Sequence, residues 1–482
     1  MLTPAASRRL HSTTTVSTVA ELTAAVANAS IGRILLVAGT YAFSSGTACT
    51  ASYDPSALCI SRNVSLEALE PGTVVLNAQG TSSRYRRVLC ISAGTVDVIG
   101  LNITGGYVSA GGGGMYITGS ATVIITGTNI YSNQVTGFPP LDGGGISING
   151  GTVSIIDTNI YSNQADGYGG GVEVECSTGD VTFDKCEIHS NTADTGGGGM
   201  HIHCDPGYTG TVSIVDTNIY HNQATVDCPN CGFGGGIFIV VGTVSISGTM
   251  IYSNQALIGL FRGEGGGIFN TDGTVTIAGS KIFSNQAKKD GGGIVNDGLL
   301  FLHDTVVTNN TAQEGGGILN NGGLLILSDH VRITSNHATK GSQVSNPVGA
   351  ALYELPTPPG TYLPNDYICK ENGCQKPPCG QICNFTHFPD VHMANLSLVV
   401  DDPIPFHCPR GRWCDGNGTY PCDAGLLGDG TNFSDARCGG ECPLGAYCPP
   451  AIEHCAIKDE GVTDYTGHSY GLRNAIAADL VE

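Results

Sequence analysis

Residues 143–165 read GGGISINGGTVSIIDTNIYSNQA, a phrase that recurs with variations between Gly111 and Ala338. Each copy holds a glycine run, a short apolar segment, a TVSI-like segment and a NIYSNQA-like segment. The copies align on an apolar residue three positions before a recurring asparagine, at intervals of roughly 25 to 32 residues. Self-similarity at this period predicts a solenoid, a propeller or an array of small units.

The pattern inside each copy selects among these architectures. Ile146 and Ile148 follow the glycines, and Val153 and Ile155 alternate with polar residues, as half-buried strands require. No copy shows apolar residues at helical spacing, and a copy is too short for the four strands of a propeller blade. We therefore expect an all-β parallel β-helix with three short strands per turn, each stacked on its equivalent in the next turn.

The glycine run before an apolar residue, together with the strand end apolar-x-x-Asn, resembles the right-handed, single-stranded parallel β-helix family. That family includes pectate-lyase-like proteins and polymorphic outer-membrane adhesins. The resemblance covers about residues 16–340 and implies a right-handed coil with a capping helix at its N-terminal end. It constrains activity little, because this fold hosts lyases, hydrolases and adhesins alike.

Composition excludes several classes of partner. The 482 residues include 21 Lys plus Arg against 41 Asp plus Glu, which leaves a net charge of −20. Nucleic acid and anionic membranes both require clustered positive charge, so neither is an expected partner. No apolar run is long enough for a transmembrane helix, so no membrane-spanning segment is expected.

The N-terminal end divides into a tail and a cap. Residues 1–15 are polar, lack the apolar core of a signal peptide and are expected to be disordered. Thr18 and Glu21 form a capping-box pattern, which predicts a short helix over about residues 18–28. We expect this helix to cover the first turn of a β-helix spanning residues 16–340, because a solenoid exposes its end strands.

The repeat stops after Ala338, and the remainder is rich in cysteine and proline. We expect a linker over residues 341–407, a small disulfide-rich module over 408–455 and a tail over 456–482. The pattern CPxGxxC, present at Cys408 and again at Cys442, resembles the cysteine-rich repeats of ephrin-receptor-like ectodomains. Modules of this size depend on disulfides because they cannot build a sufficient core.

Cysteines and glycosylation sequons both indicate an oxidising, secretory setting. The chain has 19 cysteines. We therefore expect an extracellular or cell-surface glycoprotein whose signal peptide is missing from this chain. The Asn-x-Ser/Thr sequons lie at Asn28, Asn63, Asn102, Asn309, Asn384, Asn395, Asn417 and Asn432.

Three disulfides are predicted within the repeat region. Cys49 and Cys59 share one loop, Cys176 and Cys204 occupy equivalent positions in consecutive turns, and Cys228 and Cys231 form a CPNC motif. Equivalent positions in adjacent turns lie within the Cα separation that a disulfide allows. The Cys176–Cys204 bond would fix the two strands that precede it.

The recurring asparagine is interpreted as a structural ladder. It lies where the strand turns, and asparagine tolerates a left-handed backbone and can hydrogen-bond to its equivalent in the next turn. The ladder is expected at Asn133, Asn163, Asn191, Asn222, Asn254, Asn285, Asn310 and Asn336.

An outward-facing column of aromatic residues follows the aligned apolar residue by one position. One interpretation is a stack of rings that stabilises the strands. The other is an exposed stripe that stacks on sugar rings. Its members are Tyr131, Tyr161, Tyr220, Tyr252 and Phe283, with His189 in the same column.

The strongest candidate for chemistry is a patch of four residues on two consecutive strands. Glu173 and Glu175 in one strand are expected to face outward beside His201 and His203 in the next. Such a patch could hold a divalent metal or supply an acid and a base, so it is the candidate catalytic site. The alternative is a set of charge-complementary neighbours on a solvated face that needs no cofactor.

The sequence departs from the polysaccharide lyases that share this fold. No arginine lies between Arg87 and Arg262, so the arginine base of pectate lyases has no counterpart there. Asp157, Asp216 and Asp304 alternate with glycine at one turn position, which indicates turn chemistry. We therefore favour a binding or structural module, adhesin-like and glycan-binding, over an enzyme. The alternative is a pectate-lyase-like lyase or glycoside hydrolase that uses the Glu/His patch.

Overall fold

The computed structural model describes residues 12–49, 54–137, 142–176, 179–204, 210–225, 232–256, 263–328 and 330–346, and the backbone of five short strands beyond them. The chain divides into two compact units. The first comprises Met1–Leu300, Thr305–Asn321 and Ile333–Ser345. The second comprises Phe301–Asp304, Gly322–Arg332 and Asn346–Glu482.

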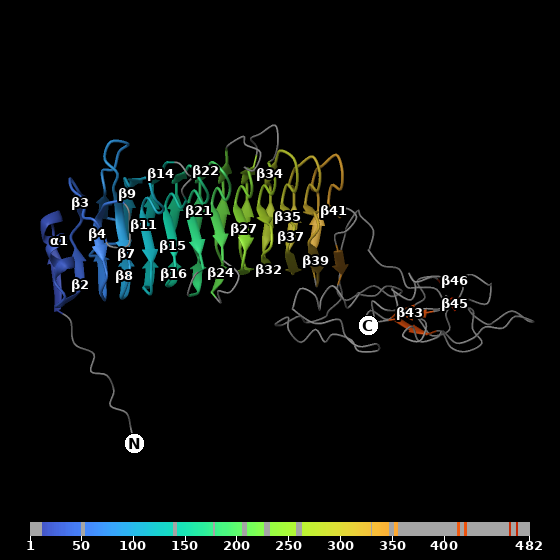
Figure 1. The fold of residues 1–482 in the computed structure, drawn as a ribbon, viewed down its shortest axis with the longest axis horizontal. Coiled ribbons are helices and arrows are strands. Elements are labelled where there is room, and N and C mark those ends of the chain that lie inside the picture. The colour runs from blue at the N-terminus through green and yellow to red at the C-terminus, as the bar shows by residue number, and fades with distance from the viewer. Residues whose placement is uncertain are drawn as a thin grey trace, which may run out of the picture. The chain divides into compact units, whose positions relative to one another are not determined.

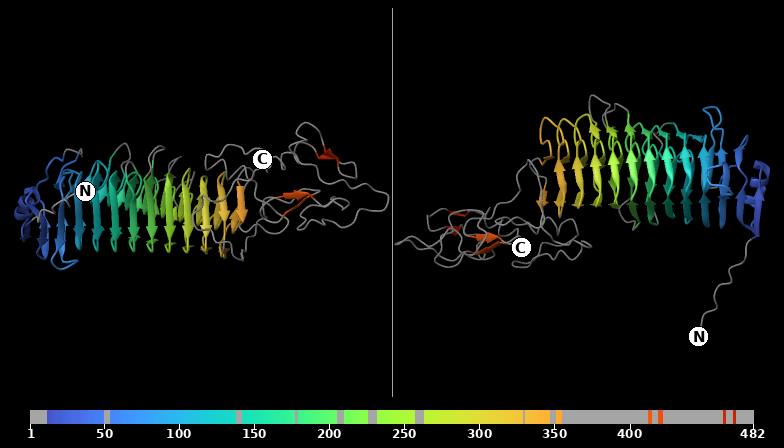
Figure 2. Two further views of the ribbon diagram at one scale, coloured as in Figure 1. Left: turned by 90° about the horizontal axis from the view of Figure 1, so that it is seen from below. Right: turned by 180° about the vertical axis from the view of Figure 1, so that it is seen from behind.

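The first unit is a parallel β-solenoid, as the repeat predicted. Each turn contributes one strand to each of three parallel sheets, and the turns stack in chain order from the blue end to the yellow turns (Figure 1). The same order is visible from below and from behind (Figure 2). We name the sheets after the phrase of residues 143–165: the GGG sheet, the TVSI sheet and the NIY sheet.

The GGG sheet contains the strands that follow the glycine runs, together with their equivalents in the first and last turns. In spatial order they are β4 (Ser56–Ile60), β7 (Arg87–Ile91), β11 (Met115–Thr118), β15 (Ile146–Asn149), β19 (Val172–Glu175), β23 (Met200–His203), β27 (Ile237–Val241), β31 (Ile268–Asn270), β35 (Ile294–Asn296), β38 (Ile318–Asn320) and β41 (Val344–Ser345).

The TVSI sheet contains the second strand of each turn. In the first unit its order is β1 (Ser12–Val16), β2 (Ile31–Leu36), β5 (Val64–Ala68), β8 (Thr95–Ile99), β12 (Thr122–Thr126), β16 (Thr152–Ile156), β20 (Val181–Asp184), β24 (Thr211–Val215), β28 (Thr243–Ser247), β32 (Thr274–Ala278) and β36 (Leu299–His303), the last three residues of which belong to the second unit.

The NIY sheet contains the third strand. Its order is β3 (Gly39–Ala42), β6 (Val74–Asn77), β9 (Leu101–Thr104), β13 (Asn129–Tyr131), β17 (Asn159–Tyr161), β21 (Glu187–His189), β25 (Asn218–Tyr220), β29 (Met250–Tyr252), β33 (Lys281–Phe283), β37 (Val306–Thr308) and β40 (Arg332–Thr334).

The structure adds a fourth, two-residue strand to the three that the sequence predicted. It follows the recurring asparagine, and two residues are too short to show a period of two. These strands form a separate sheet of β10 (Tyr107–Val108), β14 (Gln134–Val135), β18 (Gln164–Ala165), β22 (Thr192–Ala193), β26 (Gln223–Ala224), β30 (Gln255–Ala256) and β34 (Gln286–Ala287).

One α-helix occurs in the described residues, α1 (Val19–Ala27), and it begins at the predicted capping box. The Glu21 backbone N–H donates to Thr18 Oγ1 at 3.2 Å, and the Thr18 N–H donates to Glu21 Oε2 at 3.2 Å. Leu22 and Val26 are buried, so the helix packs its apolar face toward the solenoid. No helix in this part of the chain is long and apolar enough to cross a membrane.

The interior of the solenoid is filled by stacked aliphatic side chains and one buried polar ladder. Ile160 and its equivalents are fully buried, as are Val153 and Ile155 and theirs. In the ladder, Asn222 Nδ2 donates to Asn254 Oδ1 at 3.0 Å, and the same pattern links consecutive turns from Asn133 to Asn336. The eight predicted ladder asparagines are all buried.

The ladder ends on a different residue. Asn336 Nδ2 donates to Gln343 Oε1 at 3.0 Å, so a glutamine takes the place of the next asparagine. At the other end, Asn133 Oδ1 accepts a hydrogen bond from the Gly106 N–H at 2.9 Å. Both ends of the ladder therefore have hydrogen-bond partners.

The turn beside the ladder differs from the expectation. The left-handed residue is the one before the asparagine, for example Ser162 at φ 54° and Ser253 at φ 53°, and not the asparagine itself. The side-chain amide of the asparagine hydrogen-bonds to the equivalent asparagines of neighbouring turns inside the solenoid. The left-handed conformation is therefore adopted by the residue that precedes it. The predicted turn at Asp157 and Asp216 does adopt positive φ, at 48° and 46°.

Close approach between turns explains the glycine runs. A Cβ at Gly145 would lie 2.6 Å from the Gly171 carbonyl oxygen in the next turn, and one at Gly171 would lie 2.7 Å from the Gly199 carbonyl oxygen. Real side chains do not tolerate such distances, so only glycine allows the backbones to stack here.

The second unit contains β39 (Leu324–Leu327), which pairs in parallel with β42 (Ala351–Glu354). It also contains two antiparallel pairs, β43 (Arg412–Cys414) with β44 (Thr419–Pro421) and β45 (Val462–Thr463) with β46 (Ser469–Tyr470). Most of the predicted linker (341–407), cysteine-rich module (408–455) and C-terminal tail (456–482) lie outside the described residues. Residues 1–11 of the predicted disordered N-terminus do so as well, but the prediction is wrong for residues 12–15, which belong to β1 and pair with β2.

Candidate functional site

The Glu/His patch belongs to one continuous column on the outer face of the GGG sheet. Strand register places Glu173 beside His201, and Glu175 beside His203, in consecutive turns. The second residue of each strand continues this column. Its members around the patch are Ser147, Glu173, His201, Phe238, Phe269, Val295 and Leu319.

A second layer covers much of this column. The residues just before the glycine runs form parallel bridges from turn to turn, at Tyr168, Gly196, Phe233 and Glu264. An apolar cluster results between this layer and the strands, and Tyr168 packs against it. We call it the outer cluster, and its members are Phe233, Phe238, Phe269, Val295 and Leu319.

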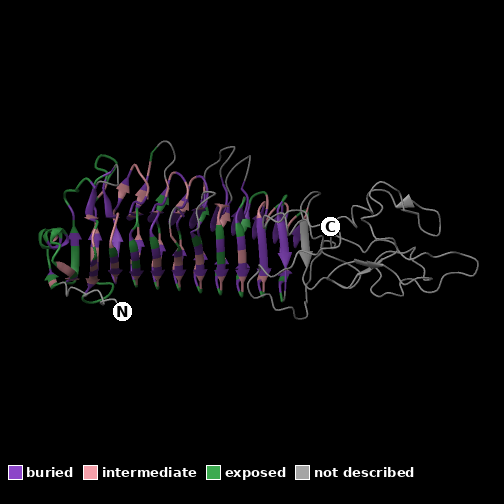
Figure 3. Cartoon of the chain, turned by 60° about the horizontal axis from the view of Figure 1, so that its bottom comes forward, coloured by how far each residue is buried: buried purple, intermediate pink, exposed green. Residues whose placement is uncertain are grey.

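Glu173 and His201 lie beneath this layer. They are 3% and 4% exposed, and Figure 3 shows buried residues along the solenoid strands. His201 Nδ1 lies 3.2 Å from Glu173 Oε1. The Tyr168 ring stacks on His201 at a centroid separation of 4.5 Å, and Phe238 lies 5.3 Å from His201. Both side chains lie on the outer face of their strands, but the solvated face considered as the alternative is not present at these two residues, because the pre-glycine residues fold back over the sheet.

Asp142 adds a second carboxyl beside Glu173 that the sequence did not indicate, and it is only partly exposed. The Tyr168 N–H donates to Asp142 Oδ1 at 2.6 Å. Burial and the Glu173 charge raise the pKa of Asp142 to about 7. Burial and the charge of Glu175 raise the pKa of Glu173 well above its ordinary value. The two carboxyls thus favour their protonated forms.

Burial acts on His201 in the opposite direction. It lowers the pKa of the imidazole to about 4, against the opposing influence of Asp142 and Glu175. The ring is therefore neutral at pH 7. Its Nε2 atom is buried and has no hydrogen-bond partner among the described residues.

Glu175 and His203 form a shallower layer beside the buried pair. Both are partly exposed. Asn149 Nδ2 donates to the Glu175 carboxylate, and the His203 ring lies 6.3 Å from that of His201. The predicted disulfide Cys176–Cys204 is present immediately after these residues and links their two strands. The structure therefore brings all four patch residues onto adjacent strands but separates them into two depths.

The described residues contain no group of three or more His, Cys, Asp or Glu side chains that could hold a metal ion. The divalent metal considered for the Glu/His patch consequently gains no support from this geometry. The side chains of Glu173 and His201 are within hydrogen-bond distance of each other and do not point together toward a position that a metal ion could occupy.

The aromatic column forms a continuous stack on the NIY sheet. Ring centroids of consecutive members are 4.8 to 5.1 Å apart, with interplanar angles of 2° to 13°. Each ring face is therefore covered by the next ring, and only the ring edges reach solvent. At the two ends of the stack, the register neighbours of Tyr131 and Phe283 are Thr104 and Thr308.

Other predicted sites have varied outcomes. The Cys49–Cys59 disulfide is present, whereas Cys228–Cys231 lies outside the described residues.

The predicted glycosylation sequons differ in exposure. Asn28, Asn63 and Asn309 are exposed, but Asn102 is buried and its Nδ2 donates to the Gly72 carbonyl at 2.7 Å. A glycan cannot attach to that nitrogen in the folded protein. The sequons at Asn384, Asn395, Asn417 and Asn432 lie outside the described residues.

Sequence reasoning missed Asp142 and Tyr168, which decide the environment of the patch. Both end connections that vary in length between copies. The available signal was their fixed position, because Asp142, Tyr168, Phe233 and Glu264 each lie immediately before a run of three glycines.

Comparison with solved structures finds similar chains at low identity. A pectate lyase, Pel9A, is 16% identical over 68% of this chain and 74% of the lyase, with a TM-score of 0.36. The A-module of mannuronan C-5 epimerase AlgE4 from Azotobacter vinelandii is 14% identical over 71% of this chain and 92% of that module, with a TM-score of 0.35. PfbA, a surface adhesin of Streptococcus pneumoniae, is 12% identical over 69% of this chain and 86% of the adhesin chain, with a TM-score of 0.24. No family model and no curated protein matches the chain.

Proposed function

We propose that this protein is an extracellular or surface-attached β-solenoid that acts as a rigid, adhesin-like binding or structural module and not as an enzyme. The observation that carries this proposal is the burial of Glu173 and His201 beneath Tyr168. A general acid or base must come within hydrogen-bond distance of the substrate proton. These two side chains are covered and already paired with each other.

The ladders support the structural part of the proposal. Eight buried asparagines and six stacked rings connect consecutive turns without a gap. Each turn contacts its neighbours through backbone, amide and ring interactions at once, which favours a stiff rod. The two disulfides support an oxidising location outside the cell.

A carbohydrate is the partner that we propose for the aromatic stripe. Aromatic side chains can stack on sugar rings, and the two ends of the stack, Tyr131 and Phe283, adjoin the smaller side chains of Thr104 and Thr308. Between them, the partly exposed edges of Tyr161, Tyr220 and Tyr252 present hydroxyl groups for hydrogen bonds to a polysaccharide.

The test combines a glycan array with lyase and hydrolase assays on polyuronides. We expect binding without turnover, weakened about tenfold or more by Tyr131→Ala combined with Phe283→Ala, because a stacking contact contributes roughly 1 kcal/mol or more. Glu175→Gln combined with His203→Gln serves as the matched control. It alters the partly exposed half of the patch, and we expect it to leave binding unchanged.

The same experiment tests polysaccharide cleavage as a second function. Glu175 and His203 favour that alternative, because they are in register and partly exposed. Turnover that is lost in the Glu175→Gln/His203→Gln variant would overturn the proposal and identify an active site. Glu173→Ala and His201→Ala are unsuitable for this purpose, since both remove buried groups.

A further inference from the structure

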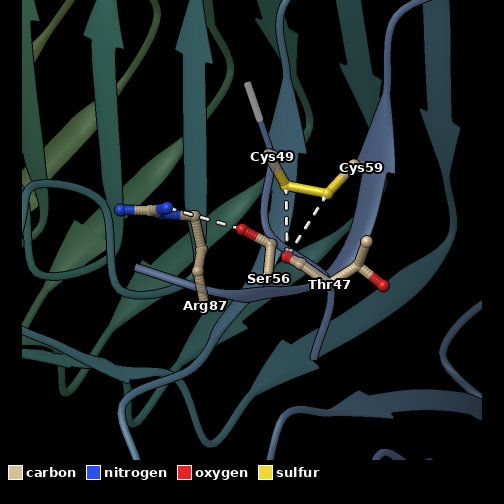
Figure 4. The surroundings of a disulfide bond; sticks show 5 residues. All are labelled: Thr47, Cys49, Ser56, Cys59 and Arg87. Carbon is tan, nitrogen blue, oxygen red and sulfur yellow. Dashed lines mark hydrogen bonds between the residues drawn. A yellow bond between two sulfur atoms is a disulfide. The ribbon is translucent and has the colours of Figure 1, made fainter. Parts of the chain in front are cut away.

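Three cysteines meet at the start of the GGG sheet, and only two of them are bonded. Cys59 lies in β4 and forms a disulfide with Cys49, at a Cα separation of 5.7 Å (Figure 4). Cys90 lies in β7 and is a free, buried thiol. The parallel register of the two strands places Cys59 directly beside Cys90.

This arrangement matches a disulfide found elsewhere in the same sheet. Cys176 and Cys204 follow the register pair Glu175 and His203 in consecutive turns, and they are bonded at a Cα separation of 4.5 Å. Neighbouring strands lie about 4.8 Å apart, and disulfides span Cα separations of roughly 4.4 to 6.8 Å. Cys59 and Cys90 therefore have the strand geometry of a turn-to-turn disulfide.

We propose that Cys49, Cys59 and Cys90 form a thiol–disulfide exchange site in which the Cys59 sulfur is shared between two alternative partners. The Cys90 thiol loses its proton, and the thiolate attacks Cys59 Sγ. A Cys59–Cys90 bond forms as the Cys49–Cys59 bond breaks, and Cys49 leaves as a thiolate that takes up a proton. The number of thiols and disulfides is unchanged, so no external oxidant or reductant is needed.

The surroundings of Cys90 set the pH dependence of the attacking step. Burial raises the pKa of the Cys90 thiol, and the buried Arg87 guanidinium offsets only part of this rise, so the thiolate fraction grows with pH. Arg87 is held in place by the Gly112 carbonyl at 2.6 Å and by the Tyr116 ring at 5.0 Å.

The chain supplies two internal controls. Cys186 is also a free, buried thiol, but its neighbours in the equivalent column are Thr158 and Thr217, so it has no disulfide to attack. The Cys176–Cys204 bond has no cysteine in register beside it within the described residues. We expect Cys186 to remain free and Cys176–Cys204 to remain intact under conditions in which Cys59 changes partner.

The test is peptide mapping by mass spectrometry of the full chain, incubated without added thiol or oxidant and then blocked in acid with a maleimide. A peptide carrying Cys59–Cys90 should form about tenfold faster for each pH unit between about pH 5 and 8, with Cys49 blocked in the same molecules. Cys49→Ser, oxidised during folding, provides the standard for that peptide. Cys90→Ser should lack it entirely.

Two results would overturn the proposal. One is a wild-type chain that retains only Cys49–Cys59 throughout this pH range. The other is a folded Cys49→Ser chain, verified by its circular dichroism, in which Cys59 and Cys90 are both blocked as free thiols. Detection of Cys59–Cys90 in the wild type, with Cys186 still free, would support it.

Discussion

Tyr168 lies nearly flat on His201, with ring centroids 4.5 Å apart and an interplanar angle of 20°. The tyrosine comes from the layer in front of the glycine run, and the histidine comes from a strand of the next turn. This contact covers the Glu173–His201 pair and changes its role. A pair that would be a candidate acid and base on an open face is part of the packing between two layers.

We expect His201→Ala to lower the free energy of unfolding by about 3 kcal/mol. The substitution leaves the Glu173 carboxyl buried without its imidazole partner and opens a gap beneath Tyr168. His203→Ala is the matched control, because His203 is partly exposed in the same strand, and its cost should stay below about 1 kcal/mol. Denaturant unfolding measures both. Equal losses in the two variants would contradict the burial argument.

Stability should depend on pH through Asp142. Its pKa is raised from 3.8 to about 7 in the folded protein, so the folded state holds a proton that the unfolded state has released. The stability that protonated Asp142 contributes to the folded state is present in full below about pH 4 and is lost as pH rises to about 7. Asp142→Asn removes this loss. The variant should gain roughly 2 to 4 kcal/mol relative to the wild type between pH 4 and 8.

His201 produces the opposite slope, so the comparison must be made between variants. Its folded pKa is lowered from 6.5 to about 4, and the stability that it contributes above pH 6.5 is lost as pH falls to 4. Unfolding curves of wild type and Asp142→Asn at matched pH values separate the two effects. A constant difference between the two proteins from pH 4 to 8 would rule out the raised pKa of Asp142.

Asn222 should be among the costliest polar residues to replace. Its Nδ2 donates to Asn254 Oδ1 at 3.0 Å and to the Ile188 carbonyl at 2.9 Å, and its Oδ1 accepts from Asn191. Asn222→Ala leaves these buried partners unsatisfied and should cost about 3 kcal/mol or more. Asn218→Ala, which removes a partly exposed bond to Glu187, should cost about 1 kcal/mol or less. Thermal and denaturant unfolding measure both variants.

The glycine runs should tolerate alanine less than the turn glycines do. A Cβ at Gly171 would lie 2.7 Å from the Gly199 carbonyl oxygen and 2.9 Å from Asn191 Nδ2, so Gly171→Ala should cost about 3 kcal/mol. Gly279 has positive φ of 55°, but a Cβ there would meet only the Gly248 nitrogen at 3.9 Å. Gly279→Ala should therefore cost about 1 kcal/mol of backbone strain. Comparable losses in unfolding experiments would argue against close stacking of the turns.

The inward columns of the solenoid were predictable from sequence because each residue has a counterpart one period away. The Asn163 position is asparagine in every copy, and the Ile160 and Thr158 positions keep an apolar or a small residue, so alternation and self-similarity together identify the side of the strand that is buried. The disulfide between Cys176 and Cys204 follows from the same alignment. These predictions use only the spacing within one strand and between equivalent strands.

The environment of the candidate site was not predictable in the same way. Whether Glu173 faces solvent depends on Asp142 and Tyr168, which lie in connections of variable length. Alternation places Glu173 on the outer face of its strand, but it contains no information about what covers that face. The left-handed turn at Ser162 was misplaced for a related reason, since the Asn163 amide has partners only in neighbouring turns.

Gln343 has a consequence for where the amide column ends. A column of amides that donates to the next turn is open-ended in principle, because its last member presents hydrogen-bonding groups to any identical turn that arrives. Here the last asparagine donates instead to Gln343, only seven residues further along its own chain. The glutamine thus closes the amide column within the molecule, and the repeat ends without an unsatisfied asparagine.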